Sequence, residues 1–131
     1  MSRPPDFVVA AVVLRSDSGN VILVRKRGTQ RFMLPGGKID AGETPAAAAI
    51  REIHEELGVV LNPDELIELG VFEAAAANEP GKRVQGHMFT HPAVSDARAQ
   101  GEIAEMIWFA PGEDRDDLAP LFEHHVLPLL K

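Results

Sequence analysis

The chain of 131 residues contains no cysteine, no tyrosine and a single tryptophan. Without cysteine there is no disulfide framework, no thiolate metal site and no cysteine nucleophile. A reducing, cytoplasmic compartment is therefore the natural expectation for this chain.

Long apolar runs and positive charge are also scarce. The longest early apolar run, Phe7–Leu14, has eight residues, whereas a membrane-spanning helix needs about 20. Pro4, Pro5 and Asp6 before this run argue against a signal peptide. The 13 basic and 20 acidic residues give a net charge of −7, which disfavours binding to a nucleic-acid polymer. We expect neither a membrane nor a nucleic-acid polymer as partner, whereas a small phosphate compound can bind through a bridging cation.

The remaining composition is that of a globular chain. Apolar residues make up 45% and charged residues 25% of the sequence, close to the averages for soluble domains. The length corresponds to about one domain and suffices for a core. No internal repeat and no long linker divides the sequence, so we expect a single domain over residues 1–131.

Local patterns predict two helices. Thr44 is a good N-cap, Pro45 suits the first helical position, and Gly58 suits the C-terminal end, so one helix is expected between Thr44 and Gly58. Apolar residues at helical spacing predict a second helix over Leu118–Leu130.

Apolar and β-branched segments predict strands between and around these helices. The expected strands are Phe7–Leu14, Val21–Val24, Leu66–Ala77, Val84–His91 and Ile107–Ala110. The first two strands resemble a hairpin across the turn Ser16–Asn20, and Leu34–Lys38 is expected to be a glycine-bearing loop. The mixture of strands and helices indicates an α/β fold.

One face of the first predicted helix carries three carboxylates. Glu52, Glu55 and Glu56 are spaced i, i+3, i+4, so their side chains are neighbours and repel one another. They lie near the C-terminal end of the helix, where the macrodipole prefers cations. A hard divalent cation such as Mg²⁺ reverses both unfavourable effects, because it takes oxygen ligands. On these three residues alone, a solvated acidic face remains the alternative.

The residues around these glutamates form one continuous pattern. It consists of Gly37, five residues, Glu43, seven residues, the run Arg51–Ile53, one residue, Glu55–Glu56, one residue, and Gly58–Val59. The pattern resembles the Nudix box, GX₅EX₇REUXEEXGU, in all seven fixed identities and both aliphatic positions. By average residue usage, a chance match is on the order of 10⁻⁹ per starting position. The chain therefore resembles the Nudix family.

The resemblance implies a fold, a reaction and a metal. The implied fold is an α/β/α sandwich with a mixed β-sheet. The implied reaction is Mg²⁺- or Mn²⁺-dependent hydrolysis of a nucleoside diphosphate linked to another group. Glu52, Glu55 and Glu56 would hold the metal, joined by the carbonyl of Gly37. Arg51 would orient a neighbouring glutamate rather than touch the substrate.

The family uses different glutamates as general base. Glu52 is one candidate, and Glu102 and Glu105 are candidates from a later loop. Residues three apart face opposite ways in a regular strand, so at most one of the latter two points at the metal. Glu102, which lies farther into the loop, is the prediction, with solvent exposure of both as the alternative.

Five cations are candidates for binding the phosphates. Arg25 follows the second strand, where MutT-like nucleotide hydrolases carry a phosphate-contacting arginine. Lys26, Arg27, Arg31 and Lys38 lie near it in sequence, and a positive patch opposite the carboxylates would hold a polyphosphate. A solvated turn that offsets local acidic charge is the alternative for these residues.

The box does not specify the leaving group. The absence of tyrosine and of a proline some fifteen residues past the box disfavours the diadenosine polyphosphate and ADP-ribose groups of the family. A MutT-like hydrolase remains, which converts a (d)NTP to a (d)NMP and pyrophosphate. Residues 120–131 lack the asparagine with which MutT reads oxidised guanine, so selectivity for 8-oxo-dGTP is not predicted. Four apolar residues are candidates for a base pocket or for plain core, namely Phe32, Met33, Met88 and Phe122.

Other functions stay open at this point. One is hydrolysis of ADP-ribose or a nucleotide sugar. Another is a non-catalytic nucleotide-sensing module, which the intact box disfavours. A homodimer is compatible with the sequence, which carries no readable interface signal.

Overall fold

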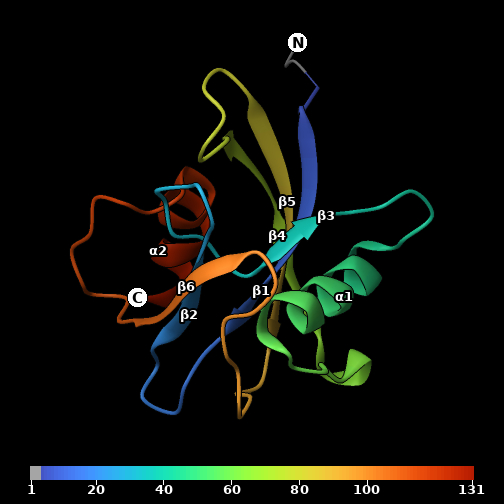
Figure 1. The fold of residues 1–131 in the computed structure, drawn as a ribbon, viewed down its shortest axis with the longest axis vertical. Helices are drawn as coiled ribbons and strands as arrows, with labels where there is room; N and C mark the ends of the chain where they lie inside the picture. Colours follow the sequence, from blue (N-terminus) through green and yellow to red (C-terminus); the bar gives the residue numbers. More distant parts are fainter. Residues whose placement is uncertain (1–3) are drawn as a thin grey trace.

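The computed structural model describes residues 4–131, which form strands, helices and short connecting loops (Figure 1). The strands are β1 Phe7–Leu14, β2 Val21–Lys26, β3 Gly36–Lys38, β4 Ile67–Ala75, β5 Arg83–His91 and β6 Ile103–Phe109. The helices are α1 Pro45–Leu57, the 3₁₀ turn η1 Pro63–Glu65, the π-helical turn η2 Phe122–Val126 and α2 Leu127–Leu130. No helix within the described residues is long and apolar enough to cross a membrane.

The strands form two sheets. The larger sheet has the order β3-β1-β5-β4, with β1 and β5 parallel and the other pairs antiparallel. The smaller sheet pairs β2 with β6 antiparallel. A sheet with both parallel and antiparallel neighbours is mixed, as predicted.

Residues 10–14 of β1 and 21–24 of β2 are buried on both faces, which explains their continuous apolar sequences. Ala10, Val12 and Leu14 of β1 pack in a core with Ile53 of α1. Val13 packs on the other side with the C-terminal helix, residues 120–130. Figure 1 shows α1 on one side of the strands and the C-terminal helix on the other. The predicted α/β/α sandwich is confirmed.

The predicted hairpin of the first two strands is wrong. The turn does form, since the amide of Ser16 donates to the carbonyl of Asn20 at 2.8 Å. However, β1 and β2 then enter different sheets and share only an isolated bridge between Arg15 and Val21. The two strands separate because β1 lies between β3 and β5, while β2 finds its partner in the distant β6.

The expected loop at Leu34–Lys38 contains the short strand β3. The backbones of Gly36 and Gly37 lie directly beside Ala11 and Ala10 of β1. A Cβ atom on Gly36 would stand 2.1 Å from the carbonyl oxygen of Ala10. Only glycine allows this close approach of the two backbones.

The second helix begins later than predicted and is irregular. Leu118 lies outside it and forms a bridge to Phe32, and the helical residues run from 120 to 130. Its centre is the π-turn η2, followed by α2 with Pro128 near its start. Proline has no backbone N–H to donate to the carbonyl four residues earlier, so a regular α-helical ladder is interrupted there. We call residues 120–130 the C-terminal helix.

Candidate functional site

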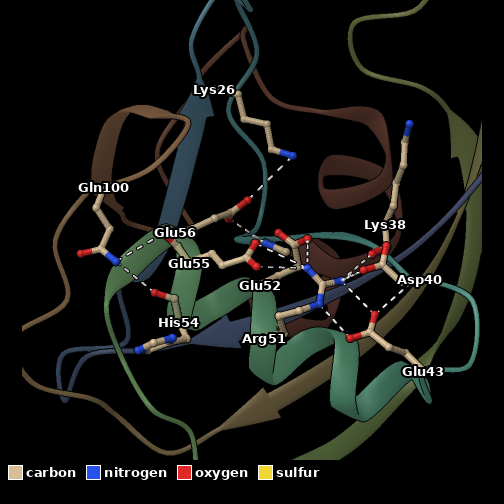
Figure 2. A network of polar contacts seen from close by, with 11 residues as sticks. Lys26, Lys38, Asp40, Glu43, Arg51, Glu52, His54, Glu55, Glu56 and Gln100 are labelled. Atoms are coloured by element: carbon tan, nitrogen blue, oxygen red, sulfur yellow. Dashed lines mark hydrogen bonds and ion pairs between the residues drawn. The ribbon is translucent and has the colours of Figure 1, made fainter.

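Helix α1 has local signals at both ends that position its glutamates. The hydroxyl of Thr44 accepts a hydrogen bond from the amide of Ala47 at 3.1 Å and caps the start. Gly58 ends the helix with a φ of 71°, and its backbone amide donates to the carbonyl of His54 at 3.0 Å. Buried Ile53 and Leu57 hold the helix on the sheet. The glutamate face therefore turns toward β3 and the end of β2 (Figure 2).

The three glutamates on this face differ in their environments. The side chain of Glu55 is 56% exposed, that of Glu52 is 15% exposed, and that of Glu56 only 5% exposed. The three neighbouring carboxylates therefore differ in burial, from the exposed Glu55 to the buried Glu56.

Glu56 is a buried carboxylate with two polar partners. Its Oε1 accepts from the amide of Gly36 at 3.0 Å, and its Oε2 lies 3.8 Å from Nζ of Lys26. Burial raises the pKa of Glu56 to about 7, with the negative charges of Glu52 and Glu102 adding to the effect and Lys26 opposing it. Lys26 and the amide of Gly36 therefore do not fully offset the cost of burying the negative charge of this carboxylate.

Arg51 holds the other acidic side chains in place. Its guanidinium donates to both carboxylate oxygens of Glu43 at 2.8 and 2.9 Å and to Glu52 at 2.9 Å (Figure 2). It also donates to the carbonyl of Lys38 at 3.1 Å and forms a 3.4 Å ion pair with Glu55. The hydrogen bonds from Arg51 lower the pKa of Glu43 to about 2. Arg51 therefore joins the first box glutamate to two of the later ones.

The carboxylate of Glu52 packs directly against the backbone of β3. A Cβ atom on Gly37 would stand 2.5 to 2.7 Å from this carboxylate, so a larger residue would displace it. No three acidic or histidine side chains of residues 4–131 are already gathered as a metal site. Arg51 and Lys26 instead form ion pairs with Glu52 and Glu56. The oxygen-only donors and the buried charge of Glu56 nevertheless fit a hard divalent cation such as Mg²⁺ or Mn²⁺.

A family model for the NUDIX domain matches residues 5–130. The chain belongs to the Nudix family. An 8-oxo-dGTP diphosphatase of Haemophilus influenzae is 44% identical over 69 residues, which are 50% of this chain and 51% of that protein. The chain spans about half to two thirds of the length of the curated relatives of this kind.

Solved Nudix structures share the fold. The crystal structure of a MutT NUDIX hydrolase from Burkholderia pseudomallei has a TM-score of 0.75 and 24% identity, and the match covers 98% of this chain and 96% of that one. A bifunctional NMN adenylyltransferase/ADP ribose pyrophosphatase from Francisella tularensis, complexed with AMP and a Mn ion, has a TM-score of 0.75 and 19% identity. That match covers 99% of this chain and 42% of that one. The predicted family and fold are confirmed.

The box residues Gly37, Arg51 and the glutamates lie together. Of the predicted residues outside the box, Glu102 lies close to Glu56, whereas Arg25 and Glu105 pair with each other. Glu102 is in the turn before β6, and its charge acts on Glu56. Glu105 instead forms a 3.1 Å ion pair with Arg25, whose guanidinium also donates to the carbonyl of Thr29. Of the two later glutamates, the geometry therefore favours Glu102 at the Nudix site. Arg25 is engaged away from the box.

Lys38 lies within the box, but its ammonium group points away from the glutamates (Figure 2). Its Nζ lies 4.8 Å from the centre of the ring of Phe7, so the ammonium group makes a favourable cation–π contact. Its backbone carbonyl, rather than its side chain, contacts Arg51. Lys38 therefore stands at the rim of the site.

Two contacts at the Nudix site were not predicted from the sequence, one by Lys26, which was a candidate for the phosphates only, and one by Gln100. Lys26, one position after Arg25, is the cation that contacts Glu56. Gln100 donates to the carbonyls of His54 and Glu55 at 3.0 and 3.4 Å and so supports the last turn of α1 (Figure 2). The basic run that contains Lys26 was a usable signal, whereas nothing near Gln100 in the sequence indicates its role.

An apolar cavity of about 190 Å³ opens beside the Nudix site. Lys26, Gly36, Gly37 and Lys38 form the end of its lining that adjoins the glutamates. Three of the four candidates for an apolar base pocket, Met33, Met88 and Phe122, also line it. Phe32 lies outside the lining and packs in the core.

Proposed function

We propose that this chain is a divalent-metal-dependent hydrolase of a nucleoside triphosphate, which it converts to a nucleoside monophosphate and pyrophosphate. The names of curated relatives such as the H. influenzae 8-oxo-dGTP diphosphatase support this class of substrate. The same names do not specify the base for this chain, because the match covers half of it.

One observation carries the proposal, namely that the apolar cavity and the glutamates share a wall. Gly36 donates to Glu56, Gly37 faces Glu52, and Lys26 contacts Glu56, and all three line the cavity. A nucleotide has a flat apolar base at one end and negatively charged phosphates at the other. The base fits the apolar cavity, and the phosphates then reach Lys26, the glycines and the glutamate face.

The residues that would hold Mg²⁺ or Mn²⁺ are Glu52, Glu55 and Glu56, with the carbonyl of Gly37. When bound, the metal supplies charge neutralisation for the phosphates and activation of the attacking water. Arg51 acts as a positioning residue, since it orients Glu52 and Glu55 through its hydrogen bonds.

A carboxylate accepts the proton of the attacking water in this reaction. Glu52 and Glu102 are the two candidates for this general base. Glu52 is held by Arg51, which fixes its orientation. Glu102 is exposed and makes no ion pair with a described residue, so it is free to turn toward the phosphates.

The phosphates would meet Lys26 and Lys38 at the mouth of the cavity. Lys26 can exchange its ion pair with Glu56 for one with a phosphate once the charge of Glu56 is neutralised otherwise. Lys38 belongs to the Nudix box and also lines the cavity. Arg25 would need to leave Glu105 before it could bind a phosphate.

The test is hydrolysis of a substrate panel with Mg²⁺ or Mn²⁺. The panel contains the (d)NTPs, 8-oxo-dGTP, ADP-ribose and nucleotide sugars, and the products are separated by chromatography. Glu55→Gln is the matched variant, because Glu55 is the most exposed box glutamate and its replacement spares the core. Glu102→Gln and Glu52→Gln then assign the general base.

Pyrophosphate release from a triphosphate that depends on Glu55 is the expected result. A sugar phosphate or ribose phosphate as product would instead assign the alternative, a hydrolase of nucleotide sugars or ADP-ribose. Turnover that is unchanged in Glu55→Gln would contradict the proposed site.

A further inference from the structure

The far end of the apolar cavity, away from the glutamates, is closed by the loop between β4 and β5. Residues 76–79 of this loop line the cavity together with Ala75 at the end of β4 and with Leu121 and Phe122 of the C-terminal helix. Figure 1 shows the loop rising beside that helix. If the phosphates of a nucleotide bind at the Nudix box, the edge of its base that is farthest from the phosphates would therefore contact this loop.

The cavity wall offers few polar side chains that could pair with a base. Those of the described residues are Lys26, Thr29, Lys38, Asn78 and Glu79. The two lysines adjoin the glutamates and Phe7, at the phosphate end. The hydroxyl of Thr29 already donates to the carbonyl of Lys26 at 2.7 Å.

Asn78 differs from the other four in its chemistry, because its side chain is an uncharged amide. Its side chain is half-buried, and within residues 4–131 it makes no hydrogen bond of its own. A side-chain amide has a donor and an acceptor side by side, which neither a lysine nor a carboxylate has.

Asn78 also stands where the cavity meets a second, more polar hollow of about 540 Å³. Thr29, Ala76, Ala77 and Asn78 form walls of both. The second hollow leaves space beside the amide for the exocyclic groups of a base.

We propose that Asn78 is a specificity-determining residue, which pairs through its side-chain amide with the edge of the base of the substrate. The proposal rests on the proposed function, because the phosphates at the Nudix box place the base at this loop. The amide suits a base edge with an adjacent donor and acceptor, such as N6–H and N7 of adenine or N1–H and O6 of guanine.

Two substitutions separate this role from simple packing. Asn78→Ala removes both hydrogen-bonding groups, so discrimination between bases should shrink by roughly 10- to 100-fold, the value of one bidentate pair. Asn78→Asp presents two acceptors instead. It should shift the ratio of kcat/KM for guanine over adenine nucleotides upward, because guanine has adjacent donors at N1 and N2 and adenine has no such pair.

The experiment measures kcat/KM for ATP, GTP, dATP and dGTP, and the dissociation constants of AMP and GMP by calorimetry. Wild type, Asn78→Ala, Asn78→Asp and Lys82→Ala are compared after their thermal unfolding is shown to be alike. Lys82 is the matched control, since it lies in the same loop but outside the lining of both hollows. Turnover of a triphosphate without a base should be equal in wild type and Asn78→Ala.

The outcomes are distinct. Altered base ratios in both Asn78 variants, with Lys82→Ala like wild type, support the proposal. Unchanged base ratios in Asn78→Ala overturn it. If wild type hydrolyses no triphosphate but binds monophosphates with a base preference that depends on Asn78, the proposed role of Asn78 is supported and the proposed reaction is contradicted. If wild type binds neither monophosphate, both fall.

Discussion

At the scale of single residues, two adjacent glycines of β3 have different tasks. A Cβ atom on Gly36 would meet backbone atoms of Ala10 and Ala11, which cannot move without disturbing β1. A Cβ atom on Gly37 would meet only the carboxylate of Glu52, the flexible end of a side chain. Gly36 therefore serves the fold, and Gly37 serves the glutamate site.

Gly37→Ala should leave the protein folded but displace the carboxylate of Glu52. We expect the affinity for Mn²⁺ to fall roughly 10- to 100-fold, as for changes in the surroundings of a metal site. Calorimetric titration with Mn²⁺ measures this, and the thermal unfolding curve checks the fold.

Gly36→Ala is the matched control and should lower the free energy of unfolding by about 1–3 kcal/mol or more through overpacking. If Gly37→Ala destabilises the protein as strongly as Gly36→Ala, the separation of tasks is wrong.

The buried carboxylate of Glu56 should make the metal-free protein less stable as the pH rises. Burial raises its pKa from 4.5 to about 7 in the folded state. Between these two values the folded state binds more protons than the unfolded state, so the free energy of unfolding falls with increasing pH. Below pH 4.5 the carboxyl group is protonated in both states, and above pH 7 it is ionised in both.

Glu56→Gln removes this ionisation and keeps an oxygen that can accept from Gly36. At pH 8 we expect the metal-free variant to be more stable than wild type by up to about 3 kcal/mol, and at pH 4 the two should be alike. Urea denaturation at both pH values measures the difference. Equal stability at pH 8 would show that Glu56 is not a destabilising buried charge.

At the scale of elements, the end of α1 depends on a distant segment. Gly58 adopts the left-handed conformation that ends the helix, and Gln100 donates to the carbonyls of His54 and Glu55. The backbone amide of Gln100 also donates to the carbonyl of Glu56 at 3.0 Å. The segment before β6 thus completes the helix turn that carries Glu55 and Glu56.

Gln100→Ala should destabilise the protein by about 1 kcal/mol through the lost hydrogen bonds. Gly58→Ala should cost at least as much, because of its positive φ and because the new Cβ would stand 2.9 Å from Oε1 of Gln100. The double variant lacks this clash, so its loss should be smaller than the sum of the two single losses.

A double-mutant cycle by urea denaturation measures the coupling. Additive losses would mean that Gln100 and Gly58 do not interact in the folded protein. Activity measured on the Gln100→Ala variant then shows whether the position of the last helix turn matters for the reaction.

At the scale of the whole molecule, folding assembles the candidate metal site from separate elements. Gly37 is in β3, the glutamates are in α1, and Glu102 precedes β6. The unfolded chain cannot hold these groups together, so a metal that binds them should stabilise the folded state alone.

A metal concentration of 100 times the dissociation constant should raise the free energy of unfolding by about 2.7 kcal/mol. Thermal unfolding of the wild type with increasing Mg²⁺, followed by addition of a chelator, measures this gain and its reversal. Glu56→Gln should gain much less. An equal gain in that variant would place the bound metal elsewhere.

Much of the local structure could be predicted from the sequence, because its causes are local. Thr44, Pro45 and Gly58 determine the bounds of α1 through capping and backbone preference. The spacing of Glu52, Glu55 and Glu56 determines that they share a helix face. The same spacing, with Gly37 and Arg51, was enough to predict the Nudix family, which the family model confirms.

The tertiary structure alone decided what depends on contacts between distant residues. Nothing local separates β1 from β2, because their partners β5 and β6 lie far along the chain. Lys26 rather than Arg25 contacts the site, because successive side chains of a strand point to opposite faces and only packing selects the face. Burial of Glu56, and the meeting of Asn78 with the C-terminal helix around one cavity, likewise arise only when the layers close.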